Sequence, residues 1–84
     1  MKYAVYILEL EDESYYVGHT NNLERRFVEH RMGIGCEHTK KHPAKRVVWS
    51  EEHDTRISAA KREREIKGWS RKKKEKLWKE ASSS

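Results

Sequence analysis

The stretch YAVYILELEDESYYVG, residues 3–18, decides the fold. Residues 3–10 are apolar nearly throughout and partly β-branched, which predicts a strand in the interior of a sheet. A polar turn at residues 11–14 separates this strand from a second strand at residues 15–18. The stretch therefore predicts a β-hairpin.

The rest of the chain predicts one more strand and three helices. Asn21 and Asn22 offer capping oxygens in front of the first helix. The expected elements are a helix at 23–32, a loop at 34–43, a strand at 46–49, a helix at 56–67 and a third helix from Ser70 to about Glu80. The order ββαβαα predicts an α+β fold, with a small three-stranded antiparallel sheet flanked by three helices.

The composition allows one small domain. Only 35% of the 84 residues are hydrophobic and 39% are charged, so the core must be small. We expect the three Trp, four Tyr and one Phe to supply much of that core, because aromatic side chains bury the most area. We assign residues 1–80 to the domain and residues 81–84 to a frayed tail.

The positive charge belongs to the C-terminal third. Residues 56–79 carry eleven Lys or Arg and three Glu, whereas residues 1–55 carry eight Lys or Arg and ten Asp or Glu. A basic segment of this kind favours a polyanionic partner, most often a nucleic acid. The alternative is a solvated helix face that only keeps the protein soluble.

Other features indicate a cytoplasmic protein. Cys36 is the single cysteine, which excludes an internal disulfide and fits a reducing compartment. The first twenty residues hold four acidic side chains, which argues against a signal peptide, and no apolar run is long enough to span a membrane. Cys36, His38 and His42 have spacings that suggest a metal site, but they lack a fourth ligand, so we expect a solvated polar loop.

Polar side chains stand beside the predicted apolar stripe of the first helix. Leu23 and Phe27 define that stripe at i, i+4, and Arg26 and His30 share the face that borders it. In the hairpin, alternation turns Tyr6 away from its neighbours Val5 and Ile7. Tyr6 and Tyr16, taken alone, are typical of core or rim residues with a satisfied hydroxyl.

Glu63 lies inside the apolar stripe of the second helix, which Ala59, Ala60 and Ile66 mark. A carboxylate in such a place is costly unless it is paired or bound to a metal. Two interpretations follow. Glu63 either forms a buried salt bridge with Arg26, or it holds a metal ion.

Four segments in order resemble the GIY-YIG nuclease family. Ala4-Val5-Tyr6 and Tyr16-Val17-Gly18, with nine residues between the tyrosines, resemble the paired GIY and YIG elements. Residues 20–30 resemble the motif with the essential arginine, and residues 62–71 the segment with the metal-binding glutamate. The resemblance covers about residues 3–78 and is closest to small stand-alone bacterial members. It extends more distantly to the N-terminal nuclease domain of the DNA-repair protein UvrC.

The resemblance implies a metal-dependent DNA endonuclease that hydrolyses phosphodiester bonds. Tyr6 would act as general base, Tyr16 would hold the phosphate or the water, and His30 would relay a proton. Arg26 would bind the scissile phosphate, and Glu63 would be the sole protein ligand of one Mg²⁺ or Mn²⁺. Alignment of the motifs selects Arg26 over its neighbour Arg25 and Glu63 over Glu65.

The expected partner is DNA, with no membrane and no small-molecule cofactor. Basic side chains of the last two helices would contact flanking phosphates, namely Arg64, Lys67, Arg71, Lys73 and Lys74. Single-stranded, duplex and branched substrates stay open, as do sequence preference and oligomeric state. The alternative function is a catalytically silent nucleic-acid-binding module that uses the basic C-terminal helices. The intact catalytic set argues against it.

The chain departs from the family pattern in three places. Ala4 replaces the leading glycine, and His38 stands where an aromatic residue is often found. Several family members carry an asparagine after the metal-binding glutamate, and residues 64–84 contain none. Either Lys67 or another group substitutes for that asparagine, or this branch does without it.

Overall fold

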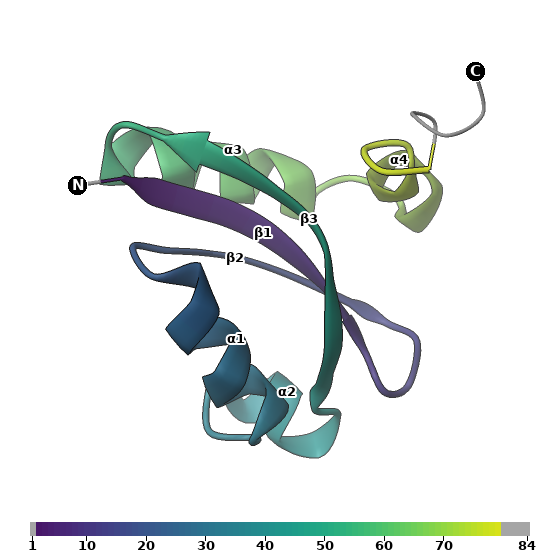
Figure 1. Cartoon of the computed structure of the whole chain (residues 1–84). Helices are drawn as coiled ribbons and strands as arrows, with labels where there is room; N and C mark the ends of the chain where they lie inside the picture. Colours follow the sequence, from purple (N-terminus) through teal and green to yellow (C-terminus); the bar gives the residue numbers. More distant parts are fainter. Residues whose placement is uncertain (1, 80–84) are drawn as a thin grey trace.

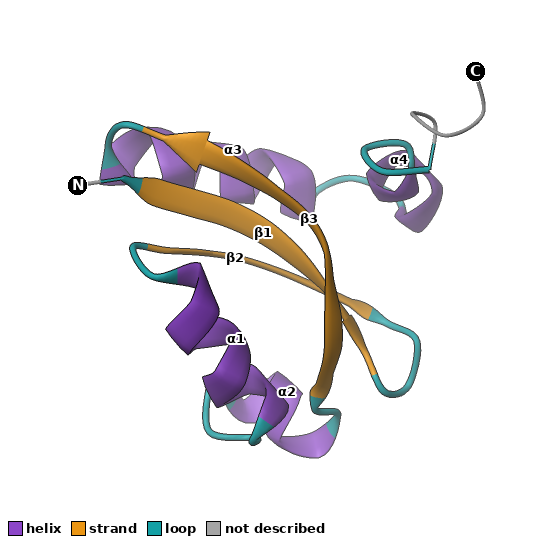
Figure 2. Ribbon diagram, viewed as in Figure 1, coloured by secondary structure: helices purple, strands orange, loops and turns teal. Residues whose placement is uncertain are grey.

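A computed structural model describes residues 2–79 of the chain (Figure 1). The α+β fold and its three-stranded antiparallel sheet are confirmed (Figure 2). The strands are β1 (Tyr3–Leu10), β2 (Tyr15–Thr20) and β3 (Ala44–His53), and the helices are α1 (Leu23–Arg31), α2 (Glu37–Lys41), α3 (Arg56–Lys67) and α4 (Arg71–Glu75). The strand order is β2-β1-β3, which puts the apolar strand β1 in the centre.

The position of β1 explains its sequence. It pairs antiparallel with β2 on one side and with β3 on the other. Helices cover both faces of the sheet (Figures 1 and 2), so side chains of both alternating sets are buried along the strand. Continuous apolar character is therefore what this strand requires.

The two faces of the sheet carry two separate clusters of buried residues. On the side of α3, Val5, Ile7 and Val17 pack against Ala59 and Ile66. We call this side the α3 face. On the side of α1 the buried residues are Tyr6, Leu8, Leu10 and Ala44, with Tyr16, Leu23 and Phe27 packed against them. We call this side the α1 face.

The expected aromatic core is found in part, because Tyr6 is buried and the other seven aromatic residues pack against the two clusters. The buried hydrophobic residues are aliphatic apart from Tyr6. Trp49, Trp69 and Trp78 are half-buried and pack around the α3 face cluster. A domain this small encloses too little volume to hide an indole completely, so the rings close the margin of the core. The Arg62 guanidinium lies 5.3 Å from the centroid of Trp69 and shields it from solvent.

Two boundaries differ from the sequence prediction. The loop expected at 34–43 contains the short helix α2, and β3 is longer than the predicted strand at 46–49. The third predicted helix ends at Glu75, because the chain tightens there into i to i+3 hydrogen bonds at Lys76 and Leu77. This turn packs Leu77 and Trp78 onto the α3 face. Glu80 and the tail predicted at 81–84 lie outside the described residues.

Within residues 2–79, no helix has the length and apolar character that a membrane span requires.

Candidate active site

Tyr6 occupies the centre of the sheet, on the α1 face. Its side chain is 1% exposed, and its cross-strand partner in β2 is Gly18. A Cβ atom at Gly18 would lie 2.6 Å from the Tyr6 hydroxyl oxygen, which is too close for any side chain. Gly18, the last residue of the Tyr16-Val17-Gly18 element, has no side chain. The Tyr6 hydroxyl occupies the space that a side chain there would fill.

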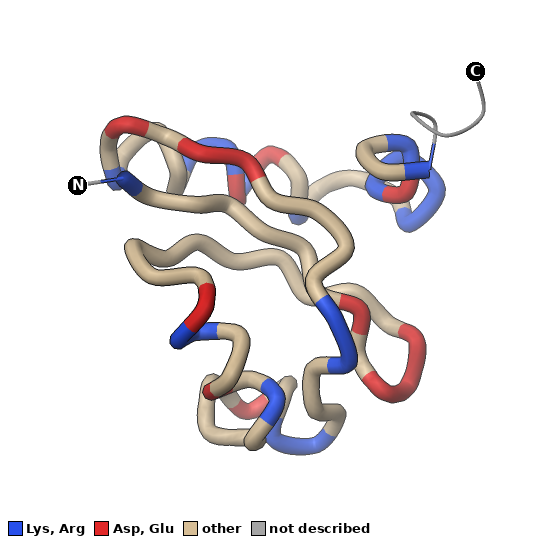
Figure 3. Tube along the Cα trace, viewed as in Figure 1, with Lys and Arg blue, Asp and Glu red and all other residues tan. Residues whose placement is uncertain are grey.

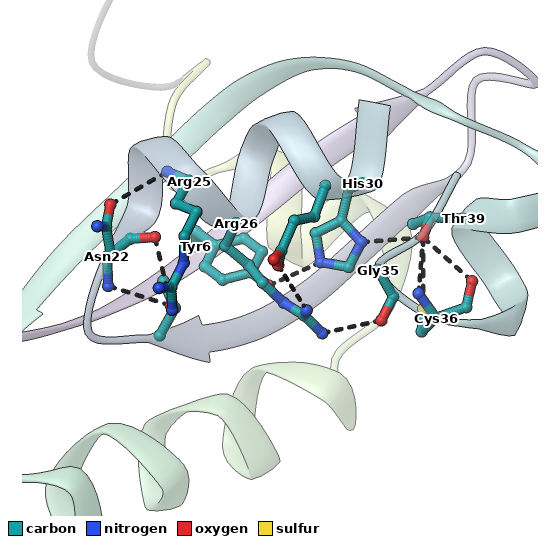
Figure 4. Close-up of polar contacts among 10 residues, drawn as sticks. Tyr6, Asn22, Arg25, Arg26, His30, Gly35, Cys36 and Thr39 are labelled. Carbon is teal, nitrogen blue, oxygen red and sulfur yellow. Dashed lines mark hydrogen bonds and ion pairs between the residues drawn. The ribbon is translucent and has the colours of Figure 1, made fainter. Parts of the chain in front are cut away.

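His30 meets Tyr6 from the last turn of α1. The histidine is fully buried, and its Nε2 lies 3.0 Å from the Tyr6 hydroxyl (Figure 4). Its Nδ1 lies 2.9 Å from the hydroxyl of Thr39, a buried residue of α2. A Cβ atom at Gly35 would lie 2.3 Å from Nδ1, so glycine is required there as well. The helix that sequence analysis missed thus supplies the second contact of the imidazole.

Tyr16 completes a group of three rings with Tyr6 and His30. Its ring centroid lies 4.8 Å from that of His30 and 6.4 Å from that of Tyr6. Burial raises the pKa of Tyr6 to about 12, against the opposing charge of Arg26, and burial also raises the pKa of Tyr16. Burial, aided by the Arg26 charge, lowers the pKa of His30 to about 4. All three rings are uncharged at neutral pH.

Arg26 extends beside this group from the middle of α1. Its Nη1 donates to Glu29 at 2.9 Å and its Nη2 donates to the carbonyl of Gly35 at 3.0 Å (Figure 4). These two bonds fix the plane of the guanidinium. The salt bridge between Glu63 and Arg26, one of the two sequence interpretations, is wrong, because Arg26 pairs with Glu29 on its own helix.

Glu63 lies on α3 and contacts a different set of residues. Its Oε1 lies 2.5 Å from Nδ1 of His19, and its Oε2 lies 2.7 Å from Nζ of Lys67. Burial pushes the pKa of Glu63 upward, but hydrogen bonds from Lys67 and His19 prevail and lower it. The side chain is 17% exposed, so an ionised carboxylate stays open to solvent on one side.

His19 and Thr39 are residues that sequence analysis missed. The signal for His19 was present, because alternation puts it on the same side of β2 as Val17, which packs toward α3. No comparable signal existed for Thr39. It reaches His30 only because a five-residue helix follows Cys36 in a stretch without apolar periodicity.

The structure thus brings four of the five predicted catalytic residues together. Tyr6, Tyr16, Arg26 and His30 form one cluster on the α1 face. Glu63 stands apart on α3, yet its charge reaches Tyr6 and contributes to the raised pKa of that residue. We call Tyr6, Tyr16, Arg26 and His30 the α1 cluster.

The predicted phosphate-binding residues have different surroundings. Lysines and arginines gather along α4 (Figure 3), but Arg71 lies over the Tyr15 ring at 4.2 Å and donates to the carbonyl of Glu13 at 2.7 Å. Lys73 lies over the Trp69 ring at 4.6 Å. Arg64 is exposed on α3. The two remaining lysines line a hollow of about 240 Å³ at the β2 edge, formed by Tyr15, Tyr16, Val17, His38, Lys67 and Lys74.

The segment around Cys36, His38 and His42 does not form a metal site. Among residues 2–79, no group of three or more His, Cys, Asp or Glu side chains is arranged to hold an ion. Cys36 is the N-cap of α2, and the His38 ring is stacked on Tyr16 with centroids 6.2 Å apart. His38 therefore continues the row of rings outward from the α1 cluster.

The fold and the paired tyrosines of its hairpin are typical of one class of small α+β nuclease. The family model described as the GIY-YIG catalytic domain matches residues 2–77, and the chain belongs to this family of nucleases. A UPF0213 protein of Haloquadratum walsbyi is 44% identical over 78 residues, which are 93% of this chain and 88% of that protein. A UPF0213 protein of Staphylococcus saprophyticus is 41% identical over 76 residues, which are 90% of this chain and 93% of that protein.

One solved structure resembles the chain in both sequence and fold. It is the solution NMR structure of a UPF0213 protein from Bacillus halodurans, which is 38% identical. The match covers 92% of this chain and 82% of that one, with a TM-score of 0.57. The family and the α+β fold expected from the sequence are both confirmed by these comparisons.

Proposed function

We propose that residues 1–80 form a divalent-metal-dependent DNA endonuclease domain that works in the cytoplasm on single-stranded or structured DNA. The observation that carries the proposal is the 3.0 Å hydrogen bond between Tyr6 and His30, buried beside Arg26. Burying such groups costs stability, so a fold keeps them where chemistry needs them. Membership of a nuclease family supports phosphodiester hydrolysis as that chemistry.

Arg26 and Tyr16 bind the scissile phosphate in this proposal. The bonds to Glu29 and Gly35 use two of the five N–H donors of Arg26, and the remaining donors suit two phosphate oxygens in bidentate fashion. The Tyr16 hydroxyl, kept protonated by burial, donates to the phosphate or to the attacking water. The guanidinium neutralises the charge that grows on the phosphorus oxygens in the transition state.

Tyr6 and His30 move the proton of the attacking water. With a pKa near 12, roughly one Tyr6 in 100,000 is ionised at neutral pH, so a pre-formed phenolate is too rare to serve as base. Instead the Tyr6 oxygen takes a proton from water while its own proton passes to Nε2 of His30. The water oxygen bonds to phosphorus, the bond from phosphorus to the 3′ oxygen breaks, and that oxygen takes a proton from solvent. His30 then returns its extra proton through Tyr6, whose hydroxyl contacts Nε2.

Glu63 holds the metal ion in this proposal. The donor set fits Mg²⁺ or Mn²⁺, because these ions are often bound through one carboxylate, with water and substrate phosphate as the other ligands. An ionised, partly exposed carboxylate meets that need, and its bonds to His19 and Lys67 leave further lone pairs for an ion. The ion would neutralise phosphate charge and assist the leaving oxygen.

The hollow at the β2 edge supports DNA as the partner. Lys67 and Lys74 line it beside Tyr16, so a phosphate there would continue the strand away from the α1 cluster. Arg64, Arg71 and Lys73 would contact flanking phosphates. Arg71 and Lys73 are held in place for this by their contacts with the Tyr15 and Trp69 rings. The stacked rings of Tyr16 and His38 suit unpaired bases, which supports single-stranded or structured DNA.

The decisive experiment compares Glu63→Gln with a matched control, Glu65→Gln. Labelled single-stranded, duplex and branched DNAs are incubated with each protein in Mg²⁺, Mn²⁺ or EDTA. We expect wild type and Glu65→Gln to cut in metal only, and Glu63→Gln to lose at least about 1,000-fold in rate, since the metal contributes several kcal/mol. Glu63→Gln should keep its fold by circular dichroism and bind DNA in EDTA at least as tightly as wild type.

Two outcomes would contradict the proposal. Near-normal cleavage by Glu63→Gln would remove the metal assignment. Wild type that binds every DNA and cuts none in either metal would identify the chain as a silent nucleic-acid-binding module. Among the three substrates, cleavage of duplex alone would contradict the assignment of single-stranded or structured DNA.

A further inference from the structure

Thr39 fixes the orientation and protonation of the histidine that the proposed reaction uses. The residue is fully buried at the third position of α2, and its hydroxyl lies 2.9 Å from Nδ1 of His30. The same hydroxyl lies 3.2 Å from the backbone nitrogen of Cys36 and 3.3 Å from the Cys36 carbonyl (Figure 4). The Cys36 sulfur is 3.6 Å away. Such a crowded hydroxyl has few ways to distribute its single proton.

The donor and acceptor count of this hydroxyl selects one tautomer of His30. A threonine hydroxyl offers one proton and two lone pairs. The Cys36 N–H can only donate, so it takes one lone pair, and we assign the proton to the Cys36 carbonyl, which also accepts the Lys40 N–H. The remaining lone pair faces Nδ1 of His30, which must then carry the N–H. Neutral imidazole has a single N–H, so Nε2 is left as a bare acceptor.

The Tyr6 side of the imidazole leads to the same tautomer. The Arg26 guanidinium carries donors only and its positive charge acts on the Tyr6 hydroxyl, so it offers the phenolic proton no acceptor. The phenolic proton of Tyr6 therefore needs an acceptor, and the buried ring offers it Nε2 of His30 at 3.0 Å. If Nε2 carried the proton, the Tyr6 oxygen would accept it, and the phenolic proton would lose Nε2 as its acceptor. The contacts at both ring nitrogens of His30 thus indicate the same tautomer.

We propose that Thr39 is a positioning residue that holds neutral His30 as its Nδ1–H tautomer, so that Nε2 can accept the Tyr6 proton. This inference rests on the proposed nuclease mechanism for its consequence, but its geometry stands without it. The relay from water through Tyr6 ends on a lone pair, and only this tautomer has that lone pair in place. When His30 accepts the proton, both its N–H groups keep partners, Tyr6 on one side and Thr39 on the other.

The test is the tautomer of His30, read from two-bond ¹H–¹⁵N spectra of the ¹⁵N-histidine-labelled protein at pH 7. His30→Gln assigns the signals among the five histidines. We expect Nδ1–H in wild type and in Thr39→Ser, which retains the hydroxyl. In Thr39→Val, which has the same shape but no hydroxyl, we expect the Nε2–H form to gain population.

Single-turnover cleavage on the same proteins gives the functional readout. Thr39→Val should cut between about 10- and 100-fold more slowly, as is usual when an orienting hydrogen bond is lost, with unchanged DNA affinity. Thr39→Ser should restore most of the rate.

An Nε2–H tautomer in wild type would overturn the inference, as would a Thr39→Val protein that keeps both the Nδ1–H form and the full rate. If Thr39→Val does not fold, the wild-type and Thr39→Ser spectra still decide the tautomer. If no DNA is cut by wild type, the nuclease proposal fails while the tautomer result stands by itself.

Discussion

The two faces of the sheet use the same strands for opposite purposes. On the α3 face, Val5 and Ile7 of β1 meet Ala59 and Ile66, and the buried cluster is wholly apolar. On the α1 face, the next side chain along the same strand is Tyr6, and its buried partners are polar. Neighbouring residues of β1 therefore face a packed apolar cluster on one side and a hydrogen-bonded network on the other.

The difference shows where the fold gains stability and where it gives some up. Apolar burial on the α3 face contributes roughly 25 cal/mol per Å² without any demand for hydrogen bonds. On the α1 face every buried polar atom needs a partner, and among the described residues none lacks one. His30 and Thr39 are fully buried and satisfied only by each other and by their neighbours. The α3 face is therefore the anchor against which the α1 cluster is held.

The largest expected effect separates the two faces with one variant on each. Tyr6→Phe removes only the hydroxyl of the proposed general base, so cleavage should fall by about 10²- to 10⁴-fold while the protein stays folded. Ile66→Ala on the α3 face should reduce the free energy of unfolding by about 2–5 kcal/mol. Its cleavage rate, measured where it is folded, should stay near that of wild type. Urea unfolding and single-turnover cleavage of both proteins test this.

An opposite pattern would remove the distinction between the faces. If the Tyr6→Phe protein unfolds, instead of staying folded and inactive, Tyr6 is an ordinary core residue. Ile66→Ala that folds normally but cuts slowly would mean that the apolar packing of the α3 face, on the helix that carries Glu63, takes part in catalysis.

Arg26 provides a smaller effect within the α1 cluster. Because it pairs with Glu29 and not with Glu63, Arg26→Lys keeps a positive charge near Glu29. Lysine cannot reproduce the planar fork, so transition-state stabilisation should fall by about 2–4 kcal/mol, a roughly 30- to 1,000-fold loss of rate. DNA affinity should fall much less. Near-normal turnover would exclude a catalytic role, and parallel losses of binding and rate would reduce Arg26 to a docking residue.

The hairpin and the α1 stripe were predictable because their signals are local. Period-two alternation turns Tyr6 away from Val5, and helical spacing puts Arg26 and His30 on one side of α1. The sheet and the helices that cover it follow from such patterns. The resemblance to a known family then selected the polar side chains worth attention, and the structure gathers four of them at one point.

The contacts of these residues were not predictable, because they depend on pairs distant in sequence. Glu63 meets His19 across forty-four residues, and Arg26 takes its carbonyl partner from Gly35. Helical periodicity indicates that Glu63 lies inside an apolar stripe, but it does not indicate which strand residue lies opposite. In the same way, a five-residue helix leaves no periodic trace, so the contact between Thr39 and His30 had no sequence signal.

The smallest expected effect is a pH dependence of stability that belongs to the α1 face. The folded protein lowers the pKa of His30 from 6.5 to about 4, mainly by burial, with Arg26 adding to the effect. The unfolded chain therefore binds a proton between pH 6.5 and 4 that the folded protein does not bind. Stability contributed by His30 is complete above pH 6.5 and is lost as the pH falls toward 4.

Between pH 7 and pH 5 this loss should amount to about 2 kcal/mol of unfolding free energy, which urea denaturation at the two pH values measures. His30→Gln is the matched variant, because glutamine is polar but does not titrate. The wild type should lose about 2 kcal/mol more than His30→Gln over this interval, whatever the other groups contribute. Equal losses would mean that His30 titrates normally in the folded protein, and the neutral imidazole on which the proton relay depends would then be absent at acidic pH. A larger loss in His30→Gln would place the acid-sensitive group elsewhere, and the α1 face would no longer differ from the α3 face in its response to pH.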